Sequence, residues 1–208
     1  MGKNYVICIG REYGSGGREI GQRLAKELGI AFYDKSLLKK AAQDSGISRE
    51  YFEKVDEKPV NWFLSNFGSG DPNVEIANPY AIDYDYLTSD RLFLIQSQVI
   101  RKLAKEQSCV IIGRCAEYVL ADYPNMFSVF VHADMESRIH RIMERQNVDR
   151  KQAEALIKKT DKKRASYHNY FCESKWGKTS SYHLSVSSSR FGLQGTVQLI
   201  KDVIEKIN

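Results

Sequence analysis

The pattern of apolar and polar positions divides the chain into short buried strands that alternate with amphipathic helices. Residues 5–9 form an apolar run typical of a strand buried on both faces, and Ile20, Leu24 and Leu28 follow at helical spacing. Further apolar runs predict strands at 30–33, 108–112, 127–131 and 184–186. Strands that alternate with helices predict a parallel sheet covered on both faces, in the α/β class.

The predicted helices between and after these strands are less uniform in length. They cover residues 35–43, 48–55, 87–105, 116–120, 137–145 and 150–160, and Val197, Ile200, Ile204 and Ile207 mark a closing amphipathic helix. Residues 57–86 differ in kind, because they contain three of the four prolines, several aromatic residues and clustered acids. A structureless loop of that length is unusual, so we predict an inserted lobe or flap within one domain, residues 1–208.

A glycine-rich turn joins the first predicted strand to the first predicted helix. Gly10, Gly14, Gly16 and Gly17 allow positive φ angles, and the unpaired N–H groups of the helix's first turn face back into the turn. Such a turn is an anion site that suits a phosphate group. A tight turn without a ligand is the alternative interpretation.

The turn departs from the Walker A pattern GxxxxGK[ST], in which the lysine reaches the β- and γ-phosphates and the hydroxyl holds magnesium. Arg11 occupies the position of the first glycine, and Gly16 that of the second. Gly17 occupies the lysine position and Arg18 the hydroxyl position. We expect Arg18 to supply the missing positive charge, because losing one such group costs about 3–4 kcal/mol of transition-state stabilisation.

The composition bears on where the protein is located in the cell and on which partners it binds. Apolar content of 42% and charged content of 27% are ordinary for a globular protein, and no segment resembles a signal peptide or a membrane span, so we expect a cytoplasmic protein without a membrane partner. The four cysteines match neither paired metal-ligand spacing nor a disulfide framework. Residues 138–164 contain ten Lys or Arg and four acids, which indicates either a surface facing a polyanion or a solvated helical face.

Five segments together resemble one family: REYGSGGREIG at 11–21, FYD at 32–34, IIGRCAEYVL at 111–120, DKKRASY at 161–167 and SKWGKTSSYHLSVSSSR at 174–190. The chain resembles the cytidylate kinase-like proteins, a branch of the nucleoside monophosphate kinases, over residues 5–207. The resemblance implies a P-loop NTPase-like five-stranded parallel sheet with helices on both faces, plus a nucleotide-binding insertion at 57–86. It also implies basic helices and a lid at 138–178, in which Arg138 and Arg141 match the basic helix loosely.

The resemblance also assigns roles to individual residues. The residues that would hold the phosphates of ATP are Gly14, Ser15, Gly16, Gly17, Arg18 and Glu19. Those that would bind the acceptor nucleotide are Asp34, Arg114, Asp161 and Arg164, and those that would act in catalysis are Arg18, Asp34, Arg114 and Arg164. This set is physically coherent, because phosphoryl transfer needs positioning and charge neutralisation more than covalent chemistry. The residues assign no magnesium ligand.

Three functional hypotheses follow. The leading one is a phosphotransferase that uses ATP and Mg²⁺ to phosphorylate a nucleoside monophosphate, CMP or dCMP in particular. The missing lysine motivates the second, a catalytically degenerate nucleotide-binding sensor, and the basic segment 138–164 motivates the least favoured, a nucleic-acid binder. Structural roles also remain open: an ion pair for Arg114, a solvated helix position for Arg164 and a helix cap for Asp34. No oligomeric state is predicted.

Overall fold

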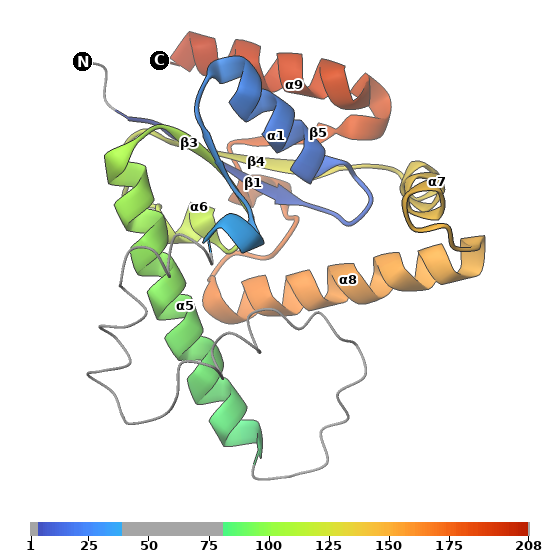
Figure 1. The fold of residues 1–208 in the computed structure, drawn as a ribbon, viewed down its shortest axis with the longest axis horizontal. Helices are drawn as coiled ribbons and strands as arrows, with labels where there is room; N and C mark the ends of the chain where they lie inside the picture. Colours follow the sequence, from blue (N-terminus) through green and yellow to red (C-terminus); the bar gives the residue numbers. More distant parts are fainter. Residues whose placement is uncertain (1–3, 39–80, 208) are drawn as a thin grey trace. The chain divides into compact units, whose positions relative to one another are not determined.

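The computed structural model describes residues 4–38 and 81–207, and it contains a five-stranded sheet (Figure 1). The strands are β1 (Val6–Arg11), β2 (Ala31–Tyr33), β3 (Cys109–Ile112), β4 (Met126–His132) and β5 (Leu184–Ser187). Every pairing is parallel, and the strand order is β2-β3-β1-β4-β5. The predicted five-stranded parallel sheet is therefore confirmed.

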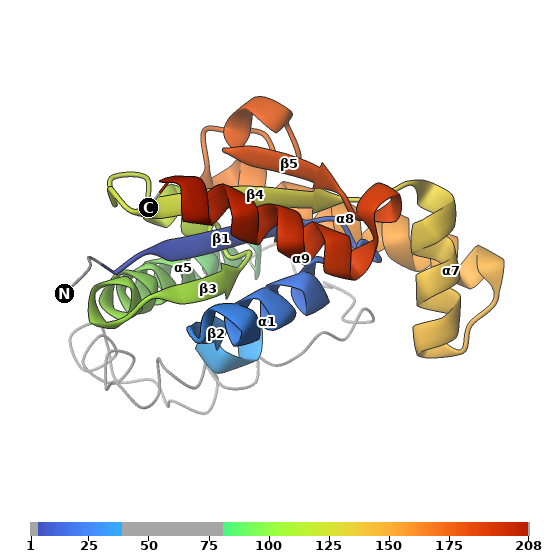
Figure 2. The same cartoon turned by 90° about the horizontal axis from the view of Figure 1, so that it is seen from above.

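Helices α1 (Gly17–Leu28) and α9 (Ser188–Ile207) lie side by side on one face of the sheet (Figure 2). Ile20 and Leu24 of α1 share one buried cluster with Ile200 of α9 and Ile7 and Ile9 of β1. Helices α6 (Ala116–Val119) and α8 (Arg150–Phe171) lie on the opposite side (Figure 1). Because both faces are covered, the central strands read as continuous apolar runs rather than alternating ones.

Helices α7 (Met135–Gln146) and α8 form a hairpin with its own small core, made of Ile139, Ile142, Ala153 and Ile157. Asp134 caps α7 by accepting a hydrogen bond from the Ser137 N–H at 2.8 Å, and Asp149 opens α8 with a capping box. Asn147, between the predicted helices 137–145 and 150–160, takes a left-handed conformation at the turn that joins α7 to α8. Tyr13 of the glycine-rich turn packs against this core, so the hairpin supports the turn directly.

Several helix boundaries differ from those that the sequence predicts. Helix α5 (Ala81–Glu106) begins inside the segment predicted as an insertion, whose residues 57–80 lie outside the described residues. Helix α8 continues past residue 160 to Phe171, because residues 161–171 contain neither glycine nor proline to stop it. Helix α9 begins at Ser188 and is broken at Gly192, with φ 66° and ψ 175°. Residues 35–38 are helical, and the predicted helix 48–55 lies outside the described residues.

The chain divides into two compact units, residues 1–35 with 103–208 and residues 36–102. The first unit holds the whole sheet and every residue of the candidate site. In the second, the Ser97 hydroxyl donates to the carbonyl of Phe93 at 2.7 Å within α5. None of the described helices combines the length and the apolar character that crossing a membrane requires. The expectation of a single domain with an inserted lobe stays a prediction.

Candidate functional site

The candidate site begins at the carboxyl ends of three neighbouring strands, where the predicted site residues Asp34 and Arg114 lie. Arg11 ends β1, Asp34 follows β2, and Gly113 and Arg114 follow β3. Because β2, β3 and β1 are adjacent in the sheet, these side chains start close together. Ligands of open parallel sheets bind beyond this edge.

The turn after β1 has the geometry of an anion site. Gly14 and Gly16 have φ angles of 84° and 79°, and α1 begins immediately afterwards at Gly17. The Ser15 hydroxyl closes the turn by donating to the carbonyl of Glu12 at 2.8 Å. Among the described residues, no acceptor receives the N–H groups of Gly14, Gly16, Arg18 or Glu19. Unpaired amides at a helix N-terminus fit the oxygens of a phosphate chain.

A side chain at Gly16 would displace the ends of two side chains that lie against the turn. A Cβ atom there would overlap Nη1 of Arg141, approach Cδ2 of Leu193 to 2.5 Å, and adopt a left-handed φ. We expect Gly16→Ala to lower the free energy of unfolding by about 2–4 kcal/mol, because left-handed strain and overpacking add. Urea denaturation measures this loss.

Gly29→Ala is the matched control for Gly16→Ala. Gly29 also has a left-handed φ, of 64°, but a Cβ atom there meets nothing within 4 Å. We therefore expect only the backbone cost of about 1–2 kcal/mol. Equal losses for the two variants would contradict the close approach of Arg141 and Leu193 to the turn.

Arg18 is paired with Asp34. Its Nε and Nη2 atoms donate to Oδ2 of Asp34 at 2.9 and 2.7 Å, and its guanidinium lies 5.8 Å from the centre of the Phe32 ring. The structure thus directs Arg18 to the end of β2, where a carboxylate neutralises it. These two residues do not fit a magnesium site, because position 18 has no hydroxyl and the carboxylate of Asp34 is ion-paired.

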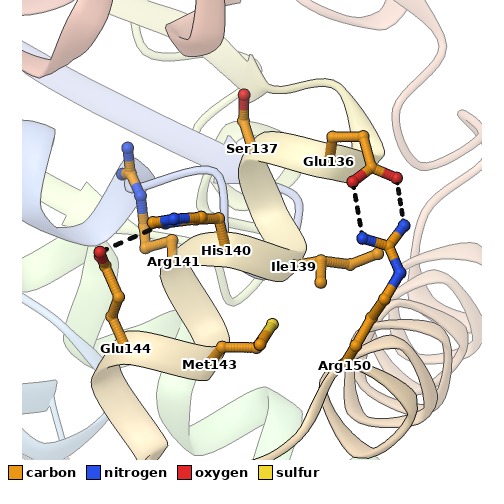
Figure 3. Close-up of a pocket in the computed structure, with 8 residues that line it drawn as sticks. All are labelled: Glu136, Ser137, Ile139, His140, Arg141, Met143, Glu144 and Arg150. Carbon is orange, nitrogen blue, oxygen red and sulfur yellow. Dashed lines mark hydrogen bonds and ion pairs between the residues drawn. The ribbon is translucent and has the colours of Figure 1, made fainter.

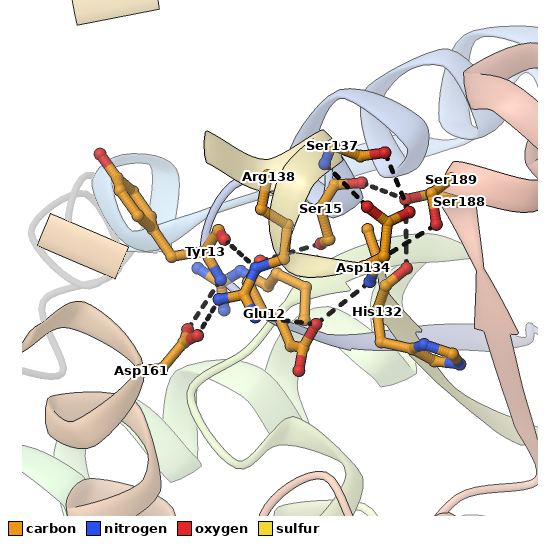
Figure 4. Close-up of polar contacts among 12 residues, drawn as sticks. Glu12, Tyr13, Ser15, His132, Asp134, Ser137, Arg138, Asp161, Ser188 and Ser189 are labelled. Atoms are coloured by element: carbon orange, nitrogen blue, oxygen red, sulfur yellow. Dashed lines mark hydrogen bonds and ion pairs between the residues drawn. The ribbon is translucent and has the colours of Figure 1, made fainter. Parts of the chain in front are cut away.

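A buried arginine fixes the turn to the helical hairpin (Figure 4). The side chain of Arg138 is 6% exposed; its Nε donates to the carbonyl of Tyr13 at 2.8 Å, and its Nη atoms pair with Glu12 and Asp161. Asp161 also accepts the N–H of Tyr13 at 2.7 Å, and Glu12 accepts the N–H of Ala133 at 3.1 Å. Asp161, which the resemblance assigns to the acceptor nucleotide, therefore contacts the turn and Arg138.

Arg141 reaches the turn from α7. Its Nη1 atom is buried, has no hydrogen-bond partner in the described part of the chain, and lies against Gly16. Arg141 also lines a hollow of about 460 Å³ on α7 and the start of α8, where it extends away from the Glu136–Arg150 ion pair (Figure 3). The sequence places Arg141 in a basic helix but gives no sign of this contact.

A cleft of about 410 Å³ opens beside the strand ends. It is lined by Gly10, Arg11, Lys35, Gly113, Arg114, Cys115, Glu117, Thr160, Lys163, Arg164, Tyr167, His168, Trp176 and Tyr182. Arg164 donates from Nη1 to the carbonyl of Arg11 at 3.0 Å, and its guanidinium lies 5.4 Å from the centre of the Tyr13 ring. The Arg114 guanidinium lies 5.7 Å from the centre of the Tyr167 ring. The fold thus brings Arg114 and Arg164 together, although fifty residues separate them in the sequence.

Arg11 is a cleft residue that sequence reasoning missed. Burial, together with the positive charges of Arg164 and Arg114, lowers the pKa of the Arg11 guanidinium to about 9. Burial also lowers the pKa of Arg164, and Asp161 opposes that change. Neither Arg11 nor Arg164 belongs to an ion pair among the described residues. The only signal in the sequence was the position of Arg11 at a strand end before the glycines.

A polar cluster forms another part of the cleft wall. His168 and the Oε1 atom of Glu117 are hydrogen-bonded at 2.9 Å, and both side chains are buried. Burial lowers the pKa of His168, but Cys172 and Glu117 raise it, and the resulting pKa is about 10. The pKa of Cys172 is lowered to about 6, because hydrogen bonds with Cys115 and His168 outweigh the effect of burial. The spacing of these residues in the sequence does not indicate a cluster. In the fold, the atoms of Glu117, His168 and Cys172 that could bind a metal ion all lie within 4.8 Å of one another.

Comparisons with known proteins place this architecture among the kinases. The model of the cytidylate kinase-like family matches residues 6–190. An uncharacterized protein from Eubacterium ventriosum has a similar structure, with 32% identity, a TM-score of 0.72, and coverage of 97% of this chain and 99% of that one. No curated protein matches the sequence.

Two shikimate kinases show the same fold at lower similarity. The enzyme from Bacteroides thetaiotaomicron has 13% identity, a TM-score of 0.51, and coverage of 97% of this chain and 98% of its own. The enzyme from Acinetobacter baumannii, in complex with shikimate, has 13% identity, a TM-score of 0.51, and coverage of 99% and 94%. The parallel sheet with helices on both faces is therefore the fold of P-loop kinases.

Proposed function

The chain belongs to the cytidylate kinase-like family, and from that premise we propose that it transfers a phosphoryl group from ATP to a nucleoside monophosphate, CMP or dCMP in particular. The fold is that of P-loop kinases, which supports a nucleotide kinase. Fold alone does not select an acceptor. The acceptor and the residue roles therefore rest on the site.

The charge of the cleft is the observation that carries the proposal. Five Lys or Arg residues line it, namely Arg11, Lys35, Arg114, Lys163 and Arg164. Its single carboxylate belongs to Glu117, which is already bonded to His168. Partly buried cations that repel one another favour an anionic ligand, because the anion replaces lost solvation and relieves the repulsion. A phosphate dianion has the charge and the oxygen acceptors to do so.

In the proposed complex, Arg114 and Arg164 grip the phosphate of the acceptor nucleotide. Guanidinium groups donate planar, bidentate hydrogen bonds, so two of them orient a phosphate and also neutralise its charge. The aromatic side chains of Tyr167, Trp176 and Tyr182 line the same cleft, and aromatic rings are the groups on which bases stack. The volume of about 410 Å³ falls within the range of roughly 300–1,000 Å³ for small-molecule sites.

The turn from Gly14 to Glu19 binds the donor phosphates in this proposal. Its unpaired amides donate to phosphoryl oxygens, and the buried Nη1 atom of Arg141 gains a partner beside Gly16. Because Arg138 holds the turn to α7 and α8, donor and acceptor sites keep a fixed relation within one unit. Holding two reactants in line supplies much of the rate enhancement in phosphoryl transfer. Arg18 and Asp34 do not form a site for Mg²⁺, so this proposal assigns no residue of the turn to the metal ion.

A coupled assay with ATP and a panel of nucleoside monophosphates tests this function. We expect ATP-dependent formation of a nucleoside diphosphate, fastest with CMP or dCMP. Small hydroxyl acceptors, shikimate among them, belong in the panel as the contrasting class. The proposal is refuted if no nucleotide gives a product. If only a hydroxyl acid gives a product, the acceptor is a hydroxyl acid and not a nucleotide.

The Arg18–Asp34 pair supports a second candidate, a nucleotide sensor without turnover. This pair neutralises an arginine that a transfer mechanism would use on the donor phosphates. The sensor predicts binding of ATP or CMP, measured by calorimetry, with no product in the coupled assay. Measurable turnover by the wild-type protein would exclude it.

A further inference from the structure

The position of Arg11 explains why residue 17 is a glycine. A Cβ atom on Gly17 would lie 2.6 Å from Cβ of Arg11 and 3.3 Å from Cβ of Val131. The atom in the way is the root of the Arg11 side chain, which cannot swing aside as a flexible end could. A lysine is therefore excluded at position 17 while position 11 is an arginine.

The guanidinium of Arg11 lies next to the place where phosphates would bind. From the end of β1 its side chain passes Gly17, the first residue of α1, and its Nη1 atom packs against Gly113 at the end of β3. It also lines the cleft beside Arg114 and Arg164. The side chain thus crosses from the base of the phosphate turn to the acceptor side.

The two unusual residues of the turn are coupled by this geometry. In the pattern GxxxxGK, the first glycine and the lysine are six positions apart, and this chain has Arg11 and Gly17 at those positions. The glycine and the cation have exchanged places.

We propose that Arg11 performs the role of the P-loop lysine and contacts the transferring phosphoryl group between the donor turn and the acceptor arginines. This inference rests on the proposed function, and it names Arg11 as a catalytic residue of that site. The neighbouring Arg114 and Arg164 act on the acceptor phosphate, so three cations surround the group in transfer. Burial, Arg164 and Arg114 lower the pKa of Arg11, while Glu117 and Asp34 oppose that change, and none of the described carboxylates forms an ion pair with Arg11.

A cycle of three variants tests the exchange: Arg11→Gly, Gly17→Lys and the double variant that restores GxxxxGK. We expect Arg11→Gly to lower kcat/KM by about 100-fold or more, as for other preorganised electrostatic donors. Gly17→Lys alone is expected to lower both kcat/KM and the melting temperature, because the new side chain collides with Arg11. The double variant is expected to exceed Arg11→Gly in kcat/KM by about tenfold, since a lysine again reaches the phosphates. Arg150→Met, at an exposed ion pair, is the control for losing an arginine elsewhere.

Two readouts separate this inference from the proposed function. Melting temperatures report the packing, and Gly17→Lys should cost less in the Arg11→Gly background than in the wild type. Calorimetry with ATP reports the charge, and Arg11→Met should weaken binding by about tenfold or more. Unchanged ATP affinity in Arg11→Met, or equal cost of Gly17→Lys in both backgrounds, would overturn the inference. If wild type binds ATP but transfers nothing, the proposed function fails while these two results still decide the role of Arg11.

Discussion

Replacing Arg164 by methionine is expected to lower kcat/KM for the acceptor nucleotide by about 100- to 1,000-fold, the effect of removing one preorganised electrostatic donor. Arg164 lines the cleft with Arg114, and no described carboxylate forms an ion pair with it. In the proposed complex its guanidinium binds the acceptor phosphate both before and during transfer, so KM rises as well as kcat falling. Methionine keeps much of the apolar volume against Tyr13 while it removes the charge. Steady-state kinetics with CMP and saturating ATP measure the loss.

The stability of Arg164→Met provides an internal check on that result. Removing Arg164 relieves repulsion toward Arg11, and it also removes the hydrogen bond to the Arg11 carbonyl, so the two changes offset each other. We expect a change in unfolding free energy within about 1 kcal/mol. Arg150→Met should leave kcat/KM unchanged, because Arg150 pairs with Glu136 on the exposed hairpin. Wild-type kinetics in Arg164→Met would assign the acceptor phosphate to other residues.

The order of strands and helices could be predicted because each strand is a continuous buried run. Because β1, β3 and β4 are buried on both faces, most of their residues are apolar, and their apolar stretches stand out in the sequence. Helix ends were harder to predict. Helix α8 continues to Phe171 although its later residues are mostly polar, and its stability comes from tertiary packing as well as from propensity.

The location of the candidate site followed from the sequence, but the partners within it did not. A residue after a parallel strand lies at the ligand edge, and Asp34 and Arg114 meet that rule. The pairing of Arg18 with Asp34 and of Asp161 with Arg138 depends on side-chain directions fixed by tertiary packing. Motif matching compares residues position by position, so it could not show that a cation supplied by Arg11 replaces one missing at Gly17.

The charges of the basic segment also have several different environments in the fold. Arg138 is buried in a network, Arg164 lines the cleft, and Lys158 and Arg150 pair with acids on the exposed surface. A polyanion-binding face would instead present most of these cations to solvent in one direction. The distribution favours a small anionic ligand held in a cleft, and the nucleic-acid hypothesis stays a prediction.

Arg138→Met is expected to lower the free energy of unfolding by about 3 kcal/mol. Its side chain is 6% exposed and holds two carboxylates, those of Glu12 and Asp161, which are 25% and 17% exposed. Removing one partner of a buried ion pair costs about 3–5 kcal/mol, and the lower end applies because both acids retain some solvent. The carbonyl of Tyr13 also loses its hydrogen bond, so the phosphate turn loosens. Urea denaturation measures the stability, and ATP calorimetry measures the effect on the turn.

Two further variants determine whether the network or the mere loss of an arginine causes this effect. Adding Asp161→Asn to Arg138→Met removes one uncompensated carboxylate and keeps an oxygen that accepts the N–H of Tyr13, so we expect about 1 kcal/mol to be recovered. Arg150→Met breaks an ion pair whose side chains are 59% and 70% exposed, so it should cost much less stability than Arg138→Met. If Arg138→Met costs no more than Arg150→Met, the turn is held by the hydrophobic contact of Tyr13 with the hairpin, and the ion pairs contribute little.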